Sequence, residues 1–173
     1  MSEIAIRCLH PDDAALAVHT LARLKPPGER GDRVSDEDPA RLFLRRRSNV
    51  MIAATDAGQP VGYAIAYVLE RADRTEPMLL LYEIEVAPGR RRLGVGRAMI
   101  ERLKLLGGER GVFKMWVLTN HANRAARALY GASGGRESGE NLLVEWGDAD
   151  LAAQTSEAAP SFDNSSSGVS DSS

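Results

Sequence analysis

The sequence has little sulfur, no long apolar run and no excess of charge of either sign. Among 173 residues there is one cysteine, Cys8, which excludes an intramolecular disulfide and a small disulfide-stapled scaffold. No stretch approaches the roughly 20 apolar residues that cross a bilayer, and the first residues lack the basic start and apolar run of a signal peptide. We therefore expect a cytoplasmic protein without a membrane partner.

We also expect neither a nucleic acid nor a metal ion as a partner. The 22 basic and 24 acidic residues give a net charge of −2, which leaves no basic footprint for a nucleic acid. His10, His19 and His121 are scattered, with no cysteine or acidic partner at ligand spacing, so we expect no metal site. Cys8 falls in the first predicted strand, where a half-buried structural thiol is a better interpretation than a catalytic nucleophile.

The apolar pattern predicts a mixed α/β domain over residues 1–150, followed by a disordered Ser-rich tail over residues 151–173. Strands are expected at residues 4–9, 50–54, 61–69, 78–86, 112–118 and 142–146. Helices are expected from the cap at 10–13 to about 24, at 40–47, from 94 to a stop at the pair 107–108, and at 123–130. Hairpins favour antiparallel pairing and the helix between two later strands favours a parallel crossover, so we expect a mixed sheet with helices on its faces.

Chemistry is concentrated in residues 82–97, which read as a strand, a basic glycine-containing turn and the start of a helix. Unpaired N–H groups and the dipole at a helix N-terminus attract anions. Gly94 and Gly96 would let a phosphate approach the backbone, and four arginines would add positive charge: Arg90, Arg91, Arg92 and Arg97. The segment lacks the Gly-Lys-Ser/Thr ending of NTPases and the third glycine of dinucleotide sites. It predicts a diphosphate cradle, with a solvated basic turn as the alternative.

Two motifs in this order resemble the GNAT acetyltransferase superfamily. The first is Arg91-x-x-Gly94-x-Gly96, and the second is Asn123-x-x-Ala126-x-x-Leu129-Tyr130 followed by Gly134. The resemblance implies the GNAT fold, a central and mostly antiparallel sheet with a splayed parallel strand pair and flanking helices. It also implies acetyl-CoA as cosubstrate, no metal, and a possible homodimer.

Residues 62–71 and 81–86 resemble, more narrowly, the class I aminoglycoside 3-N-acetyltransferases of the gentamicin and fortimicin type. That family places an Ala-Tyr-Val-Leu strand and a Tyr-acid pair on the next strand at this spacing. The likeness spans roughly residues 50–146. It implies acetylation of the 3-amino group of aminoglycoside antibiotics by direct transfer in a ternary complex, and hence antibiotic resistance.

Carried over onto this sequence, the superfamily pattern assigns a cofactor site. Backbone groups near Ile84 and Val86 would bind the pantetheine arm, an N–H near Ile84 would polarise the thioester carbonyl, and amides from Arg91 to Arg97 would hold the pyrophosphate. The expected cofactor-binding residues are Ile84, Val86, Arg91, Arg92, Gly94, Val95, Gly96, Arg97 and Asn123.

Transfer to nitrogen needs a neutral amine, because an ammonium has no lone pair, so some group must accept a proton. Glu83 matches the acid of the family and is the expected base, with a carboxylate that only attracts the cationic amine as the alternative. Glu85 projects to the same face if the strand is regular, and either binds the substrate or, as we prefer, faces solvent. A bulge would turn one of them away. Tyr82 should lie on the opposite face and only pack.

Tyr130 is the expected general acid toward the departing thiolate, with a buried aromatic at a helix end as the alternative. Asn123 should cap its helix and contact the cofactor arm. Carboxylates available for a polycationic acceptor are Asp36, Glu37, Asp38, Glu70, Asp73, Glu137, Glu140 and Glu145, although ordinary surface charge explains most of them. Two other functions stay open: a GNAT enzyme acting on another small amine or a peptide or protein amine, and a noncatalytic acyl-CoA-binding module.

Overall fold

In the computed structural model, residues 4–26, 28 and 36–138 are described. The predicted strand at 142–146 and the predicted tail at 151–173 lie outside these residues. The strands are β1 (Ile4–Cys8), β2 (Asn49–Asp56), β3 (Gln59–Leu69), β4 (Met78–Val86) and β5 (Lys114–Val117). The helices are α1 (Ala14–Leu24), α2 (Glu37–Arg45), α3 (Val95–Glu109) and α4 (Arg124–Ala132), with short 3-10 turns η1 (Pro11–Asp13) and η3 (Pro88–Arg90).

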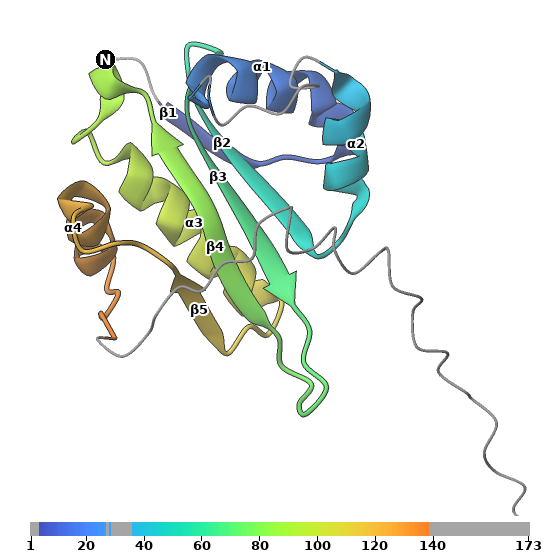
Figure 1. Ribbon diagram of the computed structural model, residues 1–173. Coiled ribbons are helices and arrows are strands. Elements are labelled where there is room, and N and C mark those ends of the chain that lie inside the picture. Colours follow the sequence, from blue (N-terminus) through green and yellow to red (C-terminus); the bar gives the residue numbers. More distant parts are fainter. Residues whose placement is uncertain (1–3, 27, 29–35, 139–173) are drawn as a thin grey trace, which may run out of the picture. The chain divides into compact units, whose positions relative to one another are not determined.

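The five strands form one sheet in the order β1-β2-β3-β4-β5 (Figure 1). The sheet is mixed, as the sequence predicts. β1 to β4 pair antiparallel, and β4 pairs parallel with β5 after the crossover through α3. The β2–β3 hairpin turns at Ala57 and Gly58, whose positive φ angles of 48° and 79° suit a tight two-residue turn.

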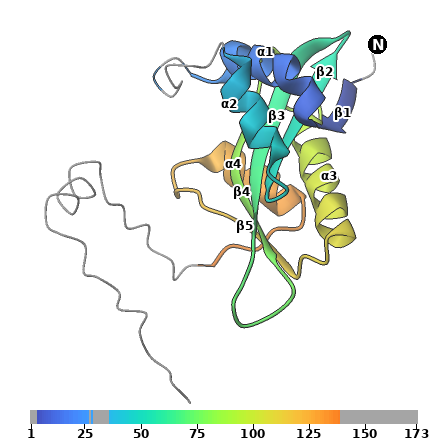
Figure 2. The ribbon, with the colours of Figure 1, turned by 90° about the vertical axis from the view of Figure 1, so that its right-hand side faces the viewer.

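Helices cover both faces of the sheet (Figure 2). On one face, Ala17 of α1 and Leu44 of α2 are buried with Met51, Ala53 and Tyr63. On the other face, α3 buries one apolar stripe against the strands, as its spacing predicts; its members are Val95, Met99, Leu103 and Leu106. The two faces of β3 and β4 are therefore called the α1 face and the α3 face.

Two predicted helix bounds are wrong for local reasons. The second helix begins at Glu37 rather than at residue 40, because the Asp36 carboxylate accepts a hydrogen bond from the Asp38 N–H at 2.9 Å and caps the first turn. The third helix passes through Gly107 and ends at Glu109. The left-handed residue that terminates it is Gly111, at φ +68°, rather than the glycine pair.

Candidate active site

The turn between β4 and α3 presents unpaired backbone N–H groups at a helix start. The first helical bond runs from the Ala98 N–H to the Gly94 carbonyl at 2.9 Å, so the N–H groups of residues 95–97 precede the first intrahelical acceptor. Gly94, at φ +83°, is the N-cap, and neither a capping side chain nor an acidic residue occupies the first turn. This end of α3 therefore favours an anion by dipole and by hydrogen-bond geometry.

The two glycines of the motif have different physical roles. Gly94 needs its left-handed backbone, and no described atom lies within 4 Å of the position that a Cβ would take. A Cβ on Gly96 would meet the Leu129 side chain at 3.0 Å, so this glycine allows α4 to pack closely on α3. Gly94 shapes the expected phosphate site, whereas Gly96 joins the two motif helices.

Two of the four arginines around this turn are engaged by carboxylates. Arg90 forms an ion pair with the buried Asp56, and Arg91 bonds Glu85 at 2.8 Å. Arg92 and Arg97 are exposed and form no ion pair with any residue that the structure describes. They are the cations of this turn that are available to an anionic ligand.

The edge of β4 beyond Leu81 has no partner strand among the described residues. Parallel pairing with β5 stops at Leu81 and Val117, while β4 continues to Val86. The Val86 N–H donates to the Glu85 carboxylate at 3.2 Å and the Val86 carbonyl accepts from Arg91 at 3.0 Å, so both point away from β3. Backbone directions alternate along a strand, and Ile84 therefore directs its own N–H and carbonyl to the same edge. The splayed strand pair that the GNAT resemblance implies predicts such an open edge of β4.

Glu83 lies on the α1 face with two hydrogen-bond donors around its carboxylate. Its Oε1 accepts from the Tyr63 hydroxyl, and its Oε2 accepts from the Lys25 ammonium at 3.0 Å. The side chains of Lys25 and Glu83 are only 21% and 19% exposed. Glu83 is thus a partly buried, already hydrogen-bonded carboxylate next to the open edge of β4.

The prediction that Tyr82 faces away from Glu83 is wrong. The β3–β4 register shifts between Ile65 and Ala66, so that Tyr82 is an extra residue in β4, a bulge. The bulge turns Tyr82 to the α1 face, where its ring lies 5.5 Å from that of Tyr67, edge to face. Glu83 and Glu85 follow the bulge in regular register and share that face.

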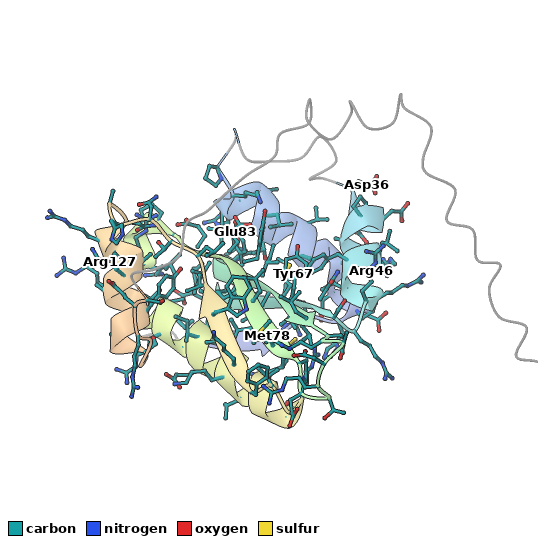
Figure 3. All side chains as sticks on the ribbon, turned by 60° about the horizontal axis from the view of Figure 1, so that its bottom comes forward. Asp36, Arg46, Tyr67, Met78, Glu83 and Arg127 are labelled. Atoms are coloured by element: carbon teal, nitrogen blue, oxygen red, sulfur yellow. The ribbon has the colours of Figure 1, made fainter. Side chains whose placement is uncertain are left out.

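An aromatic wall continues from Tyr82 along the α1 face. Tyr67 contacts Tyr82 and, at 6.0 Å, Phe43 of α2, and it lies near Glu83 in Figure 3. Burial raises the pKa of Tyr67, and the neighbouring Tyr82 and Glu83 raise it further. We define Phe43, Tyr67 and Tyr82, of which Tyr82 is 62% exposed, as the aromatic wall.

Tyr130 and Asn123 come from the other side of β4. Tyr130 is half-buried on α4 and packs against the α3-face core, and burial raises the pKa of its hydroxyl. The Asn123 side chain accepts from the Ala126 N–H at 3.1 Å, which confirms its predicted capping role. Glu83 thus lies on the α1 face, whereas Tyr130 packs on the α3 face.

Three of the acidic side chains expected around a polycationic acceptor are neutralised by neighbouring arginines. Asp36 caps α2, and the described carboxylates of Glu37, Asp73 and Glu137 pair with Arg41, Arg71 and Arg127. Asp38 and Glu70 are exposed, and Glu140 and Glu145 lie outside the described residues. The described part of the chain does not gather these carboxylates around Glu83.

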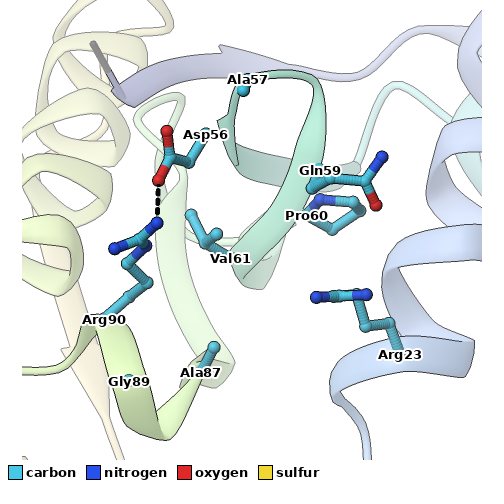
Figure 4. Close-up of a pocket in the computed structure, with 9 residues that line it drawn as sticks. All are labelled: Arg23, Asp56, Ala57, Gln59, Pro60, Val61, Ala87, Gly89 and Arg90. Carbon is cyan, nitrogen blue, oxygen red and sulfur yellow. Dashed lines mark ion pairs between the residues drawn. The ribbon is translucent and has the colours of Figure 1, made fainter. Parts of the chain in front are cut away.

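A surface hollow of about 570 Å³ opens between the end of α1, the β2–β3 hairpin and the turn after β4. Arg23 extends toward it from α1, opposite the Asp56–Arg90 ion pair (Figure 4). Ala87, which also lines the hollow, directly follows the last residue of β4, so the hollow lies beyond the end of the strand that carries Glu83. Arg23 and Arg90 against Asp56 give its lining a net positive charge.

Two residues of this site, Lys25 and Tyr63, are not among the residues that the sequence singles out. Lys25 and Tyr63 contact Glu83 across 58 and 20 residues of chain, and only the folded topology brings them together. The period-two pattern indicates the face of Tyr63, but nothing in the sequence marks Lys25.

The described residues bear on metal binding, membrane crossing and the reactivity of Cys8. Within residues 4–26, 28 and 36–138, no group of three or more His, Cys, Asp or Glu side chains is arranged to hold a metal ion. Helices of this part of the chain are too short or too polar to cross a membrane. Cys8 is half-buried, and burial raises the pKa of its thiol, which disfavours the reactive thiolate.

Comparisons with known proteins agree with this geometry. The model of the acetyltransferase (GNAT) family matches residues 15–134. The uncharacterized N-acetyltransferase YhfO of Bacillus subtilis (strain 168) is 28% identical over 107 residues, which cover 60% of this chain and 72% of YhfO.

Solved structures give the same result. An aminoglycoside acetyltransferase from an uncultured soil metagenomic sample is 26% identical, with a TM-score of 0.73 over 84% of this chain and 99% of that one. Aminoglycoside N-acetyltransferase AAC(6')-Iy in complex with CoA shares the fold at 20% identity, with a TM-score of 0.70 over 84% and 96% of the two chains. With its family model matched over more than half of its length, this chain belongs to the acetyltransferase (GNAT) family.

Proposed function

We propose that this chain is an acetyl-CoA-dependent N-acetyltransferase that acetylates the 3-amino group of an aminoglycoside by direct transfer in a ternary complex. The observation that carries the proposal is the position of the Glu83 carboxylate beside the unpaired edge of β4, with the anion-favouring start of α3 at the end of the same strand.

The residues present fit acetyl-CoA. The N–H groups of residues 95–97, together with Arg92 and Arg97, would hold the pyrophosphate, and the edge groups of Ile84 and Val86 would bind the pantetheine arm. Asn123 would contact the arm from the start of α4. Bound acetyl-CoA supplies the acetyl thioester, and the Ile84 N–H would polarise its carbonyl.

Glu83 acts as the base in this proposal, directly or through one water. It accepts a proton from the acceptor ammonium, which gives nitrogen its lone pair. Tyr130, whose raised pKa keeps the hydroxyl protonated, donates a hydrogen bond or proton to the thiolate that leaves. Glu85, held by Arg91, would set the charge of the acceptor face next to the base.

Support for the aminoglycoside comes from the sequence resemblance and from the soil acetyltransferase, which is an aminoglycoside enzyme by its name. The 3-amino position follows from the resemblance alone. A second candidate acceptor is an amine that is not a polycation, such as a peptide N-terminus. It is favoured by the neutralised carboxylates and by Lys25 and Arg23 on the α1 face.

The test is release of CoA thiol by the purified chain with acetyl-CoA and a panel of aminoglycosides, polyamines and peptides. We expect turnover with gentamicin-type compounds and, by NMR of the product, acetylation at the 3-amine. Turnover with peptides or polyamines alone would overturn the aminoglycoside assignment and retain the acetyltransferase. Acetylation at another amine of the aminoglycoside would overturn only the 3-amino position.

A further inference from the structure

We propose that Lys25 is a self-acetylation site, at which the enzyme transfers an acetyl group from acetyl-CoA to its own Lys25 side chain. The proposal rests on the proposed function, because it uses the same thioester and the same base. It adds a modification site, and a regulation of that site, to the acetylation of a free amine.

The geometry already places a primary amine on the base. The Lys25 Nζ lies 3.0 Å from the Glu83 Oε2, which is hydrogen-bond distance for proton transfer. Both side chains are about four-fifths covered, so this pair is more than a solvated surface contact. An acceptor amine bound for catalysis must reach the same carboxylate, and Lys25 therefore occupies the position of a substrate.

The backbone at Lys25 explains why this amine lies there. Lys25 is the C-cap of α1, with an extended conformation at φ −72° and ψ 133°, and its N–H closes the helix on the Leu21 carbonyl. The cap fixes the start of the side chain, while its flexible four-carbon stem lets the amine move. Glu83 and Ile84 are adjacent, with Cα atoms about 3.8 Å apart, so the carboxylate that holds Nζ and the N–H proposed to polarise the thioester belong to neighbouring residues.

The transfer is balanced without any further reactant. The Lys25 ammonium gives a proton to Glu83, and the neutral nitrogen attacks the thioester carbonyl carbon. The C–N bond forms, the C–S bond breaks, and the electron pair leaves on sulfur as the CoA thiolate, which takes up a proton. The products are an amide at Lys25 and CoA thiol.

Acetylation would change the acceptor site by electrostatics. The amide carries no charge, so the Lys25–Glu83 ion pair is lost, while the Tyr63 hydroxyl still donates to Glu83. A cationic acceptor then no longer competes with Lys25 for the carboxylate. We expect the acetylated protein to have a lower KM for a cationic amine than the unmodified protein.

The chain contains its own controls, because only three of its residues are lysines. Lys104 pairs with Glu101 on α3, at 3.0 Å, and Lys114 is exposed at the start of β5. Neither contacts Glu83. Chemical acetylation by acetyl-CoA in solution would modify them at least as fast as the more covered Lys25.

The experiment is incubation of the purified, deacetylated chain with acetyl-CoA and no acceptor, followed by peptide mass spectrometry of all three lysines over time. We expect acetyl-Lys25 to form at least tenfold faster than acetyl-Lys104 or acetyl-Lys114, at a rate independent of protein concentration. Glu83→Gln should abolish this preference, with circular dichroism and acetyl-CoA binding confirming that the variant is folded.

Three results would overturn the proposal: no acetyl-Lys25, equal rates at the three lysines, or an unchanged Lys25 rate in Glu83→Gln. A rate that rises with protein concentration would overturn the transfer within one molecule. Assaying the same preparation with free amines separates the two proposals. Turnover of a free amine without acetyl-Lys25 overturns this inference alone, whereas acetyl-Lys25 without free-amine turnover supports it and removes the acceptor assignment.

Discussion

The two sides of β4 are built in different ways. Toward α3, the expected cofactor site is made mostly of backbone groups within residues 84–97: the N–H groups at residues 95–97 and the edge groups of Ile84 and Val86. On the α1 face, the expected acceptor site is made of side chains from four separate elements: Lys25, Phe43, Tyr67 and Glu83. A site made of backbone groups tolerates most side-chain substitutions, whereas a site made of side chains changes with each substitution.

This difference predicts which property, cofactor binding or acceptor choice, substitutions on each side of β4 should change. In the proposed function, cofactor binding would depend on a backbone conformation, which Gly94 and the end of pairing at Leu81 provide. Acceptor choice would depend on charge and shape on the α1 face, where the Lys25–Glu83 pair and the aromatic wall lie. If this division is right, substitutions on the α1 face alter KM for the amine and leave acetyl-CoA binding unchanged.

The largest expected effect comes from Glu83→Gln, which removes the base and keeps the shape of the side chain. We expect kcat to fall by roughly 10²–10⁴, the usual contribution of a positioned general base. The dissociation constant for acetyl-CoA, measured by calorimetry, should stay within twofold. Glu85→Gln, two residues along the same face, is the matched control and should retain kcat within about tenfold. An unchanged kcat in Glu83→Gln would remove Glu83 from the mechanism.

Tyr130→Phe is expected to have the next largest effect. We expect kcat to fall roughly 10²-fold, because the donor to the thiolate is lost. Burial raises the pKa of Tyr130 above its ordinary value of 10, so the hydroxyl stays protonated as the pH rises through neutrality. The kcat of the wild-type protein should therefore show no loss from this group below about pH 10. Tyr67→Phe is the control, because it also removes a tyrosine hydroxyl, but from the α1 face. A wild-type kcat in Tyr130→Phe would leave this residue a packing role only.

Gly96→Val tests the close contact between the two motif helices. A Cβ at this position would lie 3.0 Å from the Leu129 side chain, so the branched side chain must push that side chain, or α4 with it, out of its present place. We expect a loss of about 1–3 kcal/mol in the free energy of unfolding, measured by urea denaturation. Gly89→Ala is the control, because no described atom lies within 4 Å of the added Cβ. Equal stability of the two variants would show that Gly96 has no packing role.

The sequence predicts the cofactor side better than the acceptor side for a physical reason. The turn, the helix start and the four apolar positions of α3 are local features, all contained within residues 82–106. Tyr82 shows the limit: period-two alternation places it on the wrong face, because a bulge depends on the partner strand. The Lys25–Glu83 contact joins residues 58 positions apart and leaves no periodic trace.

The smallest expected effect is that of Tyr82→Ala on the aromatic wall. Loss of an exposed ring next to Tyr67 should raise KM for the acceptor by about two- to fivefold, since an aromatic contact with a cationic amine contributes about 0.5–1 kcal/mol at an exposed site. Steady-state kinetics with the accepted amine measure it. Leu105→Ala, at an exposed position on α3, is the control for a surface change on the other face. Equal KM values for the two variants would place the acceptor away from the wall.

Hydrogen exchange of backbone amides with and without CoA, resolved by NMR, tests most directly whether the open edge of β4 and the start of α3 hold the cofactor. The amides of Ile84 and of residues 95–97 should exchange at least tenfold more slowly with CoA bound, because the ligand accepts their hydrogen bonds. Amides of β2, which lies within the antiparallel part of the sheet, should be unaffected. CoA binding without slower exchange at Ile84 and residues 95–97 would contradict this account of the site.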